Sequence, residues 1–130
     1  MRGDLFHNQL ADTVRTFLER RGWRVWTEKR VAAADTIAYF DLFAVKDGHG
    51  IAFEIETTAR HALDNAKKAR ALGVPVWFVV PRRRTKRQIL HKLGARFVAG
   101  GESVEVLLLD EIERELTHRR TGQTTKDEYL

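Results

Sequence analysis

The sequence has no cysteine, no apolar run long enough to cross a bilayer, and no basic-then-apolar segment at its start. Without cysteine, disulfide bonds, thiolate zinc sites and cysteine nucleophiles are excluded together, so any metal must be held by oxygen or imidazole groups. A membrane helix needs roughly 18 consecutive apolar residues, and a secretory signal needs an apolar stretch after a basic start. We therefore expect a cytoplasmic protein without a membrane partner.

The composition is that of one folded domain with a basic surface. A chain of 130 residues with 43% apolar content can bury a core of its own, and we expect one domain over residues 1–115 and a polar tail over residues 116–130. The 23 Lys and Arg residues exceed the 18 Asp and Glu residues, which gives a net charge of +5 and favours a polyanionic partner. The five histidines have no close ligand spacing, so zinc is not expected.

The order of helical and strand patterns predicts an α/β fold. Helical spacing covers residues 5–20 and 58–72, each followed by a glycine that ends the helix. Strand patterns cover residues 23–31, 37–45, 51–56 and 76–80, with a connection at residues 32–36. Thr85 is expected to cap a short helix through Leu93, and Phe97, Val98 and residues 104–109 supply one or two further strands.

A hairpin between residues 37–45 and 51–56 gathers acidic side chains. If Asp47-Gly48 forms a two-residue type I′ turn, Lys46 pairs with His49. Counting outwards from that pair, one residue at a time on each strand, brings Asp41 opposite Glu54 on the same face, with Cβ atoms about 5 Å apart. A turn that is longer or shorter by one residue would place the two carboxylates on opposite faces.

Two like charges placed opposite each other destabilise a sheet, so the pair requires compensation. A hard cation such as Mg²⁺ or Mn²⁺ fits, because it accepts one or two carboxylates together with water and phosphate oxygens. Two alternatives stay open. In the first, Glu54 and Glu56 point to solvent from the polar face of an edge strand. In the second, arginines from elsewhere in the chain neutralise the cluster without a metal.

An opening helix, a three-stranded meander with Asp41 and the Glu54-Ile55-Glu56 segment, a helix and a further strand resemble the PD-(D/E)XK, or restriction-endonuclease-like, nuclease superfamily. The resemblance spans residues 5–93 and implies an αβββαβ core with a mixed central sheet flanked by helices. Within the superfamily, the chain looks most similar to replication-relaxation proteins of plasmids and other mobile elements. The shared features are His7, Trp26 with Glu28, the strand over residues 53–58, the Lys67-Lys68 helix, and residues 76–80 followed by arginines.

The resemblance also implies roles for individual residues. Asp41 and Glu54 match the metal-binding acids, and Glu56 occupies the position where the family usually has lysine. Glu56 then acts as a general base or second ligand, or Lys67 or Lys68 from the next helix supplies the catalytic lysine. The first-helix acid of the family has no match in Asp12 or Glu19, and Glu28 is the substitute.

A basic block, Arg82-Arg83-Arg84-Thr85-Lys86-Arg87, follows the strand over residues 76–80. This block has two alternative interpretations. It is a solvated basic loop, or it is a clamp that binds phosphates through Arg82, Arg83, Arg84, Lys86 and Arg87. The sequence thus predicts a Mg²⁺- or Mn²⁺-dependent DNA endonuclease, with a catalytically inactive DNA-binding module of the same fold as the alternative. DNA is the expected partner, and a homodimer is left open.

Overall fold

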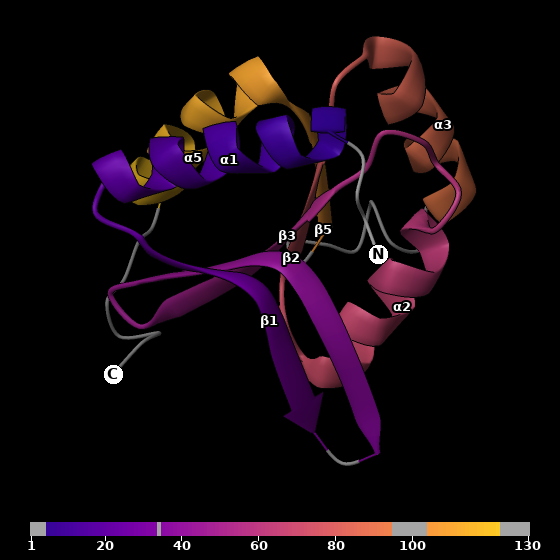
Figure 1. Cartoon of the computed structure of the whole chain (residues 1–130), viewed down its shortest axis with the longest axis horizontal. Helices are drawn as coiled ribbons and strands as arrows, with labels where there is room; N and C mark the ends of the chain where they lie inside the picture. The colour runs from indigo at the N-terminus through magenta and orange to yellow at the C-terminus, as the bar shows by residue number, and fades with distance from the viewer. Residues whose placement is uncertain (1–4, 34, 95–103, 123–130) are drawn as a thin grey trace.

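The structure is a computed structural model that describes residues 5–33, 35–94 and 104–122, with side chains described as far as residue 117 (Figure 1). Its elements are, in chain order, α1 Leu5–Arg20, β1 Arg24–Ala33, β2 Thr36–Lys46, β3 His49–Ile55, α2 Ala62–Leu72, β4 Val76–Val80, α3 Arg83–Leu93, β5 Val104–Leu108 and α5 Leu109–Gly122. The first six follow the predicted α-β-β-β-α-β order. Within these ranges, no helix combines the length and the apolar character needed to cross a bilayer.

The five strands form one mixed sheet in the order β1-β2-β3-β4-β5. β1, β2 and β3 form an antiparallel meander, whereas β4 runs parallel to β3 and β5 runs parallel to β4. The α2 crossover between β3 and β4 allows this parallel pairing. The predicted α/β class with a mixed central sheet is therefore confirmed.

Helices cover both faces of the sheet, α1 and α5 on one side and α2 and α3 on the other (Figure 1). β4 lies between the two layers and all of its residues are buried. Its side chains alternate between the layers, with Val76, Phe78 and Val80 facing α2 and α3 and Trp77 and Val79 facing α1 and α5. A strand buried on both faces has the continuous apolar sequence found here.

The turn between β2 and β3 has the predicted geometry. Asp47 and Gly48 both have positive φ angles, 53° and 83°, as a type I′ turn requires. Lys46 pairs with His49, and the ladder continues in this register as far as Leu42 and Phe53. The next residues along the two strands are Asp41 and Glu54, so the predicted register is confirmed up to their position.

The alternation of side chains along β2 shifts at Asp41. Phe40 packs in the α2 and α3 layer, whereas Leu42, two residues further on, packs in the α1 and α5 layer. Regular alternation would place both on the same face. On β1, Glu28 lies opposite Asp41 and has a φ of 50°, which is uncommon for a residue other than glycine. Both strands are therefore irregular at this level of the sheet.

Three predicted boundaries were wrong. β1 extends to Ala33 and β2 begins at Thr36, so the connection is shorter than residues 32–36. Residues 58–61 form a turn, and α2 begins only at Ala62. α3 begins at Arg83 with Arg82 in the capping position, so Thr85 is not the cap but a buried residue in the first turn.

α5 was not predicted. It extends from Leu109 to Gly122, and its Leu116 is buried, so the predicted boundary at residue 115 falls inside a packed helix. Its first turn carries Asp110 and Glu111, which favour a helix start because the N-terminus of a helix is electropositive. Phe97, Val98 and residues 123–130 of the predicted tail lie outside the described residues.

Gly48→Ala should destabilise the protein by about 1–2 kcal/mol, because a side chain strains the left-handed backbone. No atom lies within 4 Å of the added Cβ, so the cost arises from the backbone alone. Gly48→Asn is the matched control and should recover most of the loss, since asparagine tolerates this conformation. Urea denaturation measures both; equal stability of the alanine variant and wild type would contradict the strained turn.

Candidate metal and active site

Three carboxylates meet at the middle of β2 and the end of β3. Asp41 belongs to β2, Glu54 to β3, and Glu56 follows the last residue of β3. Two further polar side chains reach the group, His7 from the first turn of α1 and Asn65 from the first turn of α2. These five residues, the carboxylate cluster, come from four segments of the chain.

Asp41 and Glu54 are linked by hydrogen bonds where the β2–β3 ladder ends. The backbone N–H of Asp41 donates to Oε2 of Glu54 at 3.0 Å, and the backbone N–H of Ile55 donates to Oδ2 of Asp41 at 2.8 Å. Each carboxylate therefore binds the backbone of the strand that carries the other. This exchange confirms that the hairpin brings the two acids together.

Asn65 links the two glutamates. Its side-chain amide donates to Oε1 of Glu54 at 3.1 Å and to Oε2 of Glu56 at 3.0 Å. Glu54 is 2% exposed and Glu56 is 3% exposed, and β3 lies between β2 and β4. The alternative in which these glutamates point to solvent from an edge strand was therefore wrong.

His7 is the α1 residue that reaches the cluster. Its Nε2 lies 3.3 Å from Oδ2 of Asp41, and the side chain is buried. The sequence does carry a signal for this role, because His7 continues the buried stripe of Leu10, Val14 and Leu18 at helical spacing. A polar residue on such a stripe needs a partner inside the fold.

The substitute acid Glu28 and the two candidate lysines lie elsewhere. Glu28 is exposed on β1, and Asp12 and Glu19 pair with Arg15 on the outer face of α1. Lys67 is exposed on α2 and lies about 200° around the helix axis from Asn65, at about 100° per residue. Lys68 and His61 are exposed as well. The described hydrogen bonds of the cluster involve none of these side chains.

The cluster offers oxygen ligands of the kind that Mg²⁺ and Mn²⁺ prefer. Among the described residues, no group of three or more His, Cys, Asp or Glu side chains is arranged to enclose a metal ion. Mg²⁺ does not require such a cage, since it is commonly held by one or two carboxylates together with water and phosphate oxygens. The paired Asp41 and Glu54 carboxylates fit that limited coordination.

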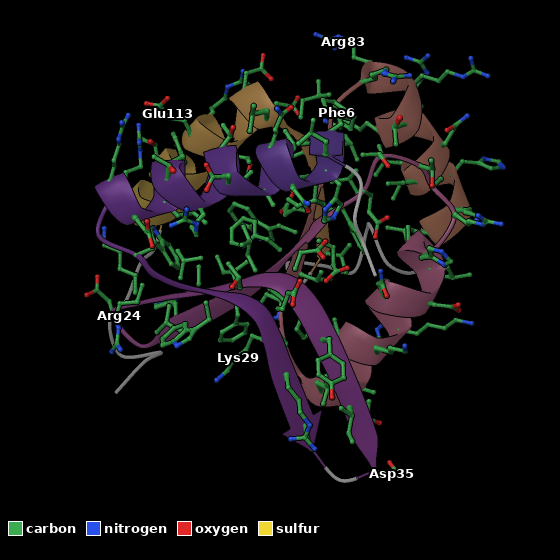
Figure 2. The ribbon with its side chains drawn as sticks, in the orientation of Figure 1. Phe6, Arg24, Lys29, Asp35, Arg83 and Glu113 are labelled. Atoms are coloured by element: carbon green, nitrogen blue, oxygen red, sulfur yellow. The ribbon has the colours of Figure 1, made fainter. Side chains whose placement is uncertain are left out.

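The outer surface of α3 is strongly basic. Arg82, Arg83, Arg84 and Arg87 are all exposed, and Figure 2 shows Arg83 at the edge of the molecule. At the other end of the helix, the Lys92 ammonium donates to the carbonyl oxygens of Ala59 and Arg60 at 3.1 and 3.3 Å. These carbonyls lie in the loop between Glu56 and α2. The basic helix is thus joined to the segment that follows the carboxylates.

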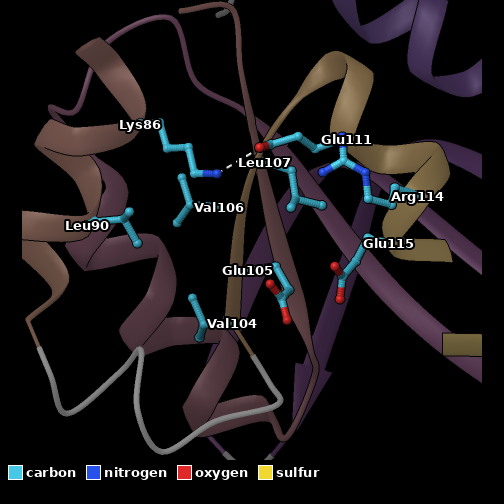
Figure 3. Close-up of a pocket in the computed structure, with 9 residues that line it drawn as sticks. All are labelled: Lys86, Leu90, Val104, Glu105, Val106, Leu107, Glu111, Arg114 and Glu115. Atoms are coloured by element: carbon cyan, nitrogen blue, oxygen red, sulfur yellow. Dashed lines mark hydrogen bonds and ion pairs between the residues drawn. The ribbon is translucent and has the colours of Figure 1, made fainter. Parts of the chain in front are cut away.

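Lys86, predicted as part of the phosphate clamp, instead faces inwards. Its ammonium lies 2.8 Å from Oε1 of Glu111, which also accepts the backbone N–H of Leu108 at 2.8 Å (Figure 3). Burial alone would raise the pKa of Glu111, but these two hydrogen bonds outweigh it and the pKa lies below its usual value. The pair joins α3 to the start of α5.

The Lys86–Glu111 pair borders a cavity of about 340 Å³ between α3, β5 and α5 (Figure 3). Arg114, Glu105 and Glu115 add charges of both signs to its wall. No member of the carboxylate cluster lines this cavity. This cavity and the carboxylate cluster are therefore separate places.

Comparison with known proteins supports the fold only. No protein-family model matches the chain, and no curated protein matches it. The fold is similar to the crystal structure of a protein of unknown function, AF1548, with a TM-score of 0.56 and 16% sequence identity. The match covers 89% of this chain and 66% of that one, so this chain spans just under two thirds of the length of its neighbour.

Asn65→Leu should lower the free energy of unfolding by about 2–4 kcal/mol, because two buried glutamates each lose a hydrogen-bond donor. Lys67→Leu is the matched control on the exposed side of α2 and should stay within about 0.5 kcal/mol of wild type. Chemical denaturation measures both variants. An Asn65→Leu variant as stable as its control would mean that the amide does not support the cluster.

Glu111 should make the protein less stable in acid. Its pKa is lowered in the folded state, so its stabilising effect is present above the usual value of 4.5 and is lost as the pH falls through the folded-state pKa. Glu111→Gln should therefore lose less stability than wild type between about pH 5 and about pH 3. Identical curves for wild type and Glu111→Gln would refute the assignment.

Proposed function

We propose that this chain is a metal-dependent nuclease that hydrolyses phosphodiester bonds in DNA, with Asp41 and Glu54 holding Mg²⁺ or Mn²⁺. The observation that carries the proposal is the reciprocal hydrogen bonding of these two acids. A purely structural role does not call for two carboxylates, because amide or hydroxyl groups accept the same N–H bonds without like-charge repulsion. A bound divalent cation would compensate that repulsion, and the two acids would then serve as its ligands.

The residues of the chain then divide the reaction between them. A divalent cation, when bound, neutralises phosphate charge and lowers the pKa of water. Glu56 accepts a proton from the attacking water, whose oxygen forms a bond to phosphorus while the bond to the departing oxygen breaks. The departing oxygen takes up a proton from solvent. Asn65 orients the carboxylate of Glu56 relative to that of Glu54, and His7 does the same for Asp41.

The exposed arginines of α3 support a DNA substrate. Arg83, Arg84 and Arg87 present positive charge to solvent, and contacts of this kind with phosphates are independent of sequence. Lys92 joins the same helix to the loop after Glu56, so a backbone held on α3 would be held in fixed relation to the acids. We further propose a cytoplasmic location, together with the mobile-element origin that the sequence resemblance implies.

A DNA-binding module without catalysis is the second candidate, and two observations favour it. Glu56 stands where the resembled family usually has a lysine, and of the two candidate replacements, both exposed on α2, Lys67 lies on the far side of the helix from Asn65. Without a lysine ammonium close to the attacked phosphate, catalysis at such a site depends more heavily on the bound metal ion. Such a module would keep the fold and the basic helix and would bind DNA without cutting it.

Cleavage of supercoiled plasmid in Mg²⁺ or Mn²⁺ tests the proposal. Asp41→Asn and Glu54→Gln should each lower the rate by about 100-fold or more, since each removes a charged metal ligand. Asp47→Asn is the matched control in the exposed turn of the same hairpin and should cut like wild type. Mn²⁺ should also raise the melting temperature of wild type and of Asp47→Asn, but not that of Asp41→Asn.

The other outcomes decide between the candidates. Salt-sensitive DNA binding with no cleavage in either metal, and no shift in melting temperature, would favour the inactive module. Cleavage that survives in Asp41→Asn would place catalysis outside the carboxylate cluster. Absence of both cleavage and DNA binding would overturn both candidates.

A further inference from the structure

The outer part of the β1–β2 hairpin has one face that none of the described helices covers. Arg30 pairs with Tyr39 and Ala32 pairs with Ile37 in the β1–β2 ladder. Directly paired residues lie on the same face, and so do residues two apart on one strand, so these four side chains share a surface. We call this surface, made by Arg30, Ala32, Ile37 and Tyr39, the arm face.

The large apolar side chains of the arm face are open to solvent. Tyr39 is 67% exposed and Ile37 is 48% exposed. The opposite face of the same strands is not, because Ala38 and Phe40 are buried in the layer of α2 and α3. The hairpin extends away from α1 and α5, with its tip at Asp35 (Figures 1 and 2). α1 therefore does not reach the arm face, although it packs over the next part of β2, at Leu42 and Ala44.

The charge beside the arm face favours a nucleic acid as its occupant. Arg30 lies on the arm face itself, opposite Tyr39, whereas the other two cations of β1, Arg24 and Lys29, lie over the Trp26 ring. An exposed aromatic ring next to a guanidinium offers a stacking surface for a base and a donor for a phosphate, and this combination is typical of sites for unpaired nucleotides. In a duplex the faces of the bases are stacked on each other, so a single strand fits the arm face better.

A second copy of the chain is the less suitable occupant. Stable protein interfaces bury about 800 Å² on each partner and involve roughly 20–30 residues on a side. The arm face offers two large apolar side chains, one alanine and a charged residue. That surface is too small to hold a dimer by itself.

We propose that the arm face binds unpaired nucleotides by stacking a base on Tyr39, with Ile37 beside it and Arg30 on the phosphate. Tyr39 is two residues from Asp41 on β2, which corresponds to about 7 Å along the strand. A DNA strand held there lies close to Asp41, the nearest member of the carboxylate cluster. The inference rests on the proposed function in one respect, the nucleic-acid substrate, and it narrows that substrate to DNA with a single-stranded segment, such as a tail or a fork.

Equilibrium binding without divalent metal tests this separately from cleavage. Fluorescence anisotropy would compare a single strand, a blunt duplex and a duplex with a single-stranded tail, each of about the same length. The variants are Tyr39→Ala, Tyr39→Phe, and a double variant, Arg84→Ala with Arg87→Ala, on α3. Leu109→Ala is the matched control, because Leu109 is an exposed apolar residue, 38% exposed, at the start of α5.

Tyr39→Ala should weaken binding of the single strand and the tailed duplex by roughly 5- to 100-fold, the usual effect of losing one stacking ring. Binding of the blunt duplex should change less than about twofold, and Tyr39→Phe should keep the wild-type preference because it retains the ring. The double variant on α3 should weaken all three ligands, whereas Leu109→Ala should weaken none. The melting temperature of Tyr39→Ala should match wild type, since the residue is exposed.

Four results would overturn the inference. Equal effects of Tyr39→Ala on single-stranded and blunt DNA would show that the ring does not recognise unpaired bases. Unchanged binding together with a loss of dimers, measured by light scattering, would show that the arm face meets a second copy. Unchanged binding of all ligands, with duplex binding still sensitive to the α3 variant, would refute the arm face alone; no DNA binding by wild type would refute the proposed function with it.

Discussion

The exchange of hydrogen bonds between β2 and β3 at Asp41 and Glu54 is the constraint on which the site depends. It occurs where the backbone ladder ends, so the two carboxylates take over the role of backbone carbonyls. Asn65 extends the arrangement to Glu56 and fixes α2 against the sheet, and His7 does the same for α1. The acids are therefore part of the packing of both helix layers. This dual use explains how three carboxylates occupy a largely buried position.

Local sequence signals predicted the features that depend on neighbouring residues. The Asp47-Gly48 turn fixes the register of its own hairpin, so the approach of Asp41 to Glu54 followed from a few residues. The apolar run over residues 76–80 likewise predicted a buried central strand, because a continuous apolar run is itself a local signal. By contrast, nothing local states which way α2 is rotated. Whether Asn65 or Lys67 faces the acids is decided by Ala62, Ala66 and Ala69, whose small side chains let the helix approach the sheet closely.

The rest could not be predicted because it depends on contacts between distant segments. α5 was missed since its apolar residues, Ile112 and Leu116, are few and its surroundings are polar. In the sequence, Lys86 is one of a run of cations. It differs from the exposed arginines of that run because it pairs with Glu111, which lies on a helix that was not predicted. His7 lies on the buried stripe of α1, which the sequence shows. Its partner Asp41 reaches it because the alternation of side chains shifts on β2, and the sequence gives no signal of that shift.

The shift at Glu28 and Asp41 has a consequence for how the protein tolerates change. The β1–β2 pairs on both sides of this level keep one register, Thr27 with Leu42 and Lys29 with Phe40, and the outer hairpin extends beyond the part that holds the acids. Residues inserted or deleted in matched pairs near Asp35 would lengthen or shorten the hairpin while leaving Asp41 in register with Glu54. Variation in hairpin length is thus separated from variation in the cluster. The length of the β1–β2 hairpin can therefore change during evolution while the carboxylate cluster stays the same.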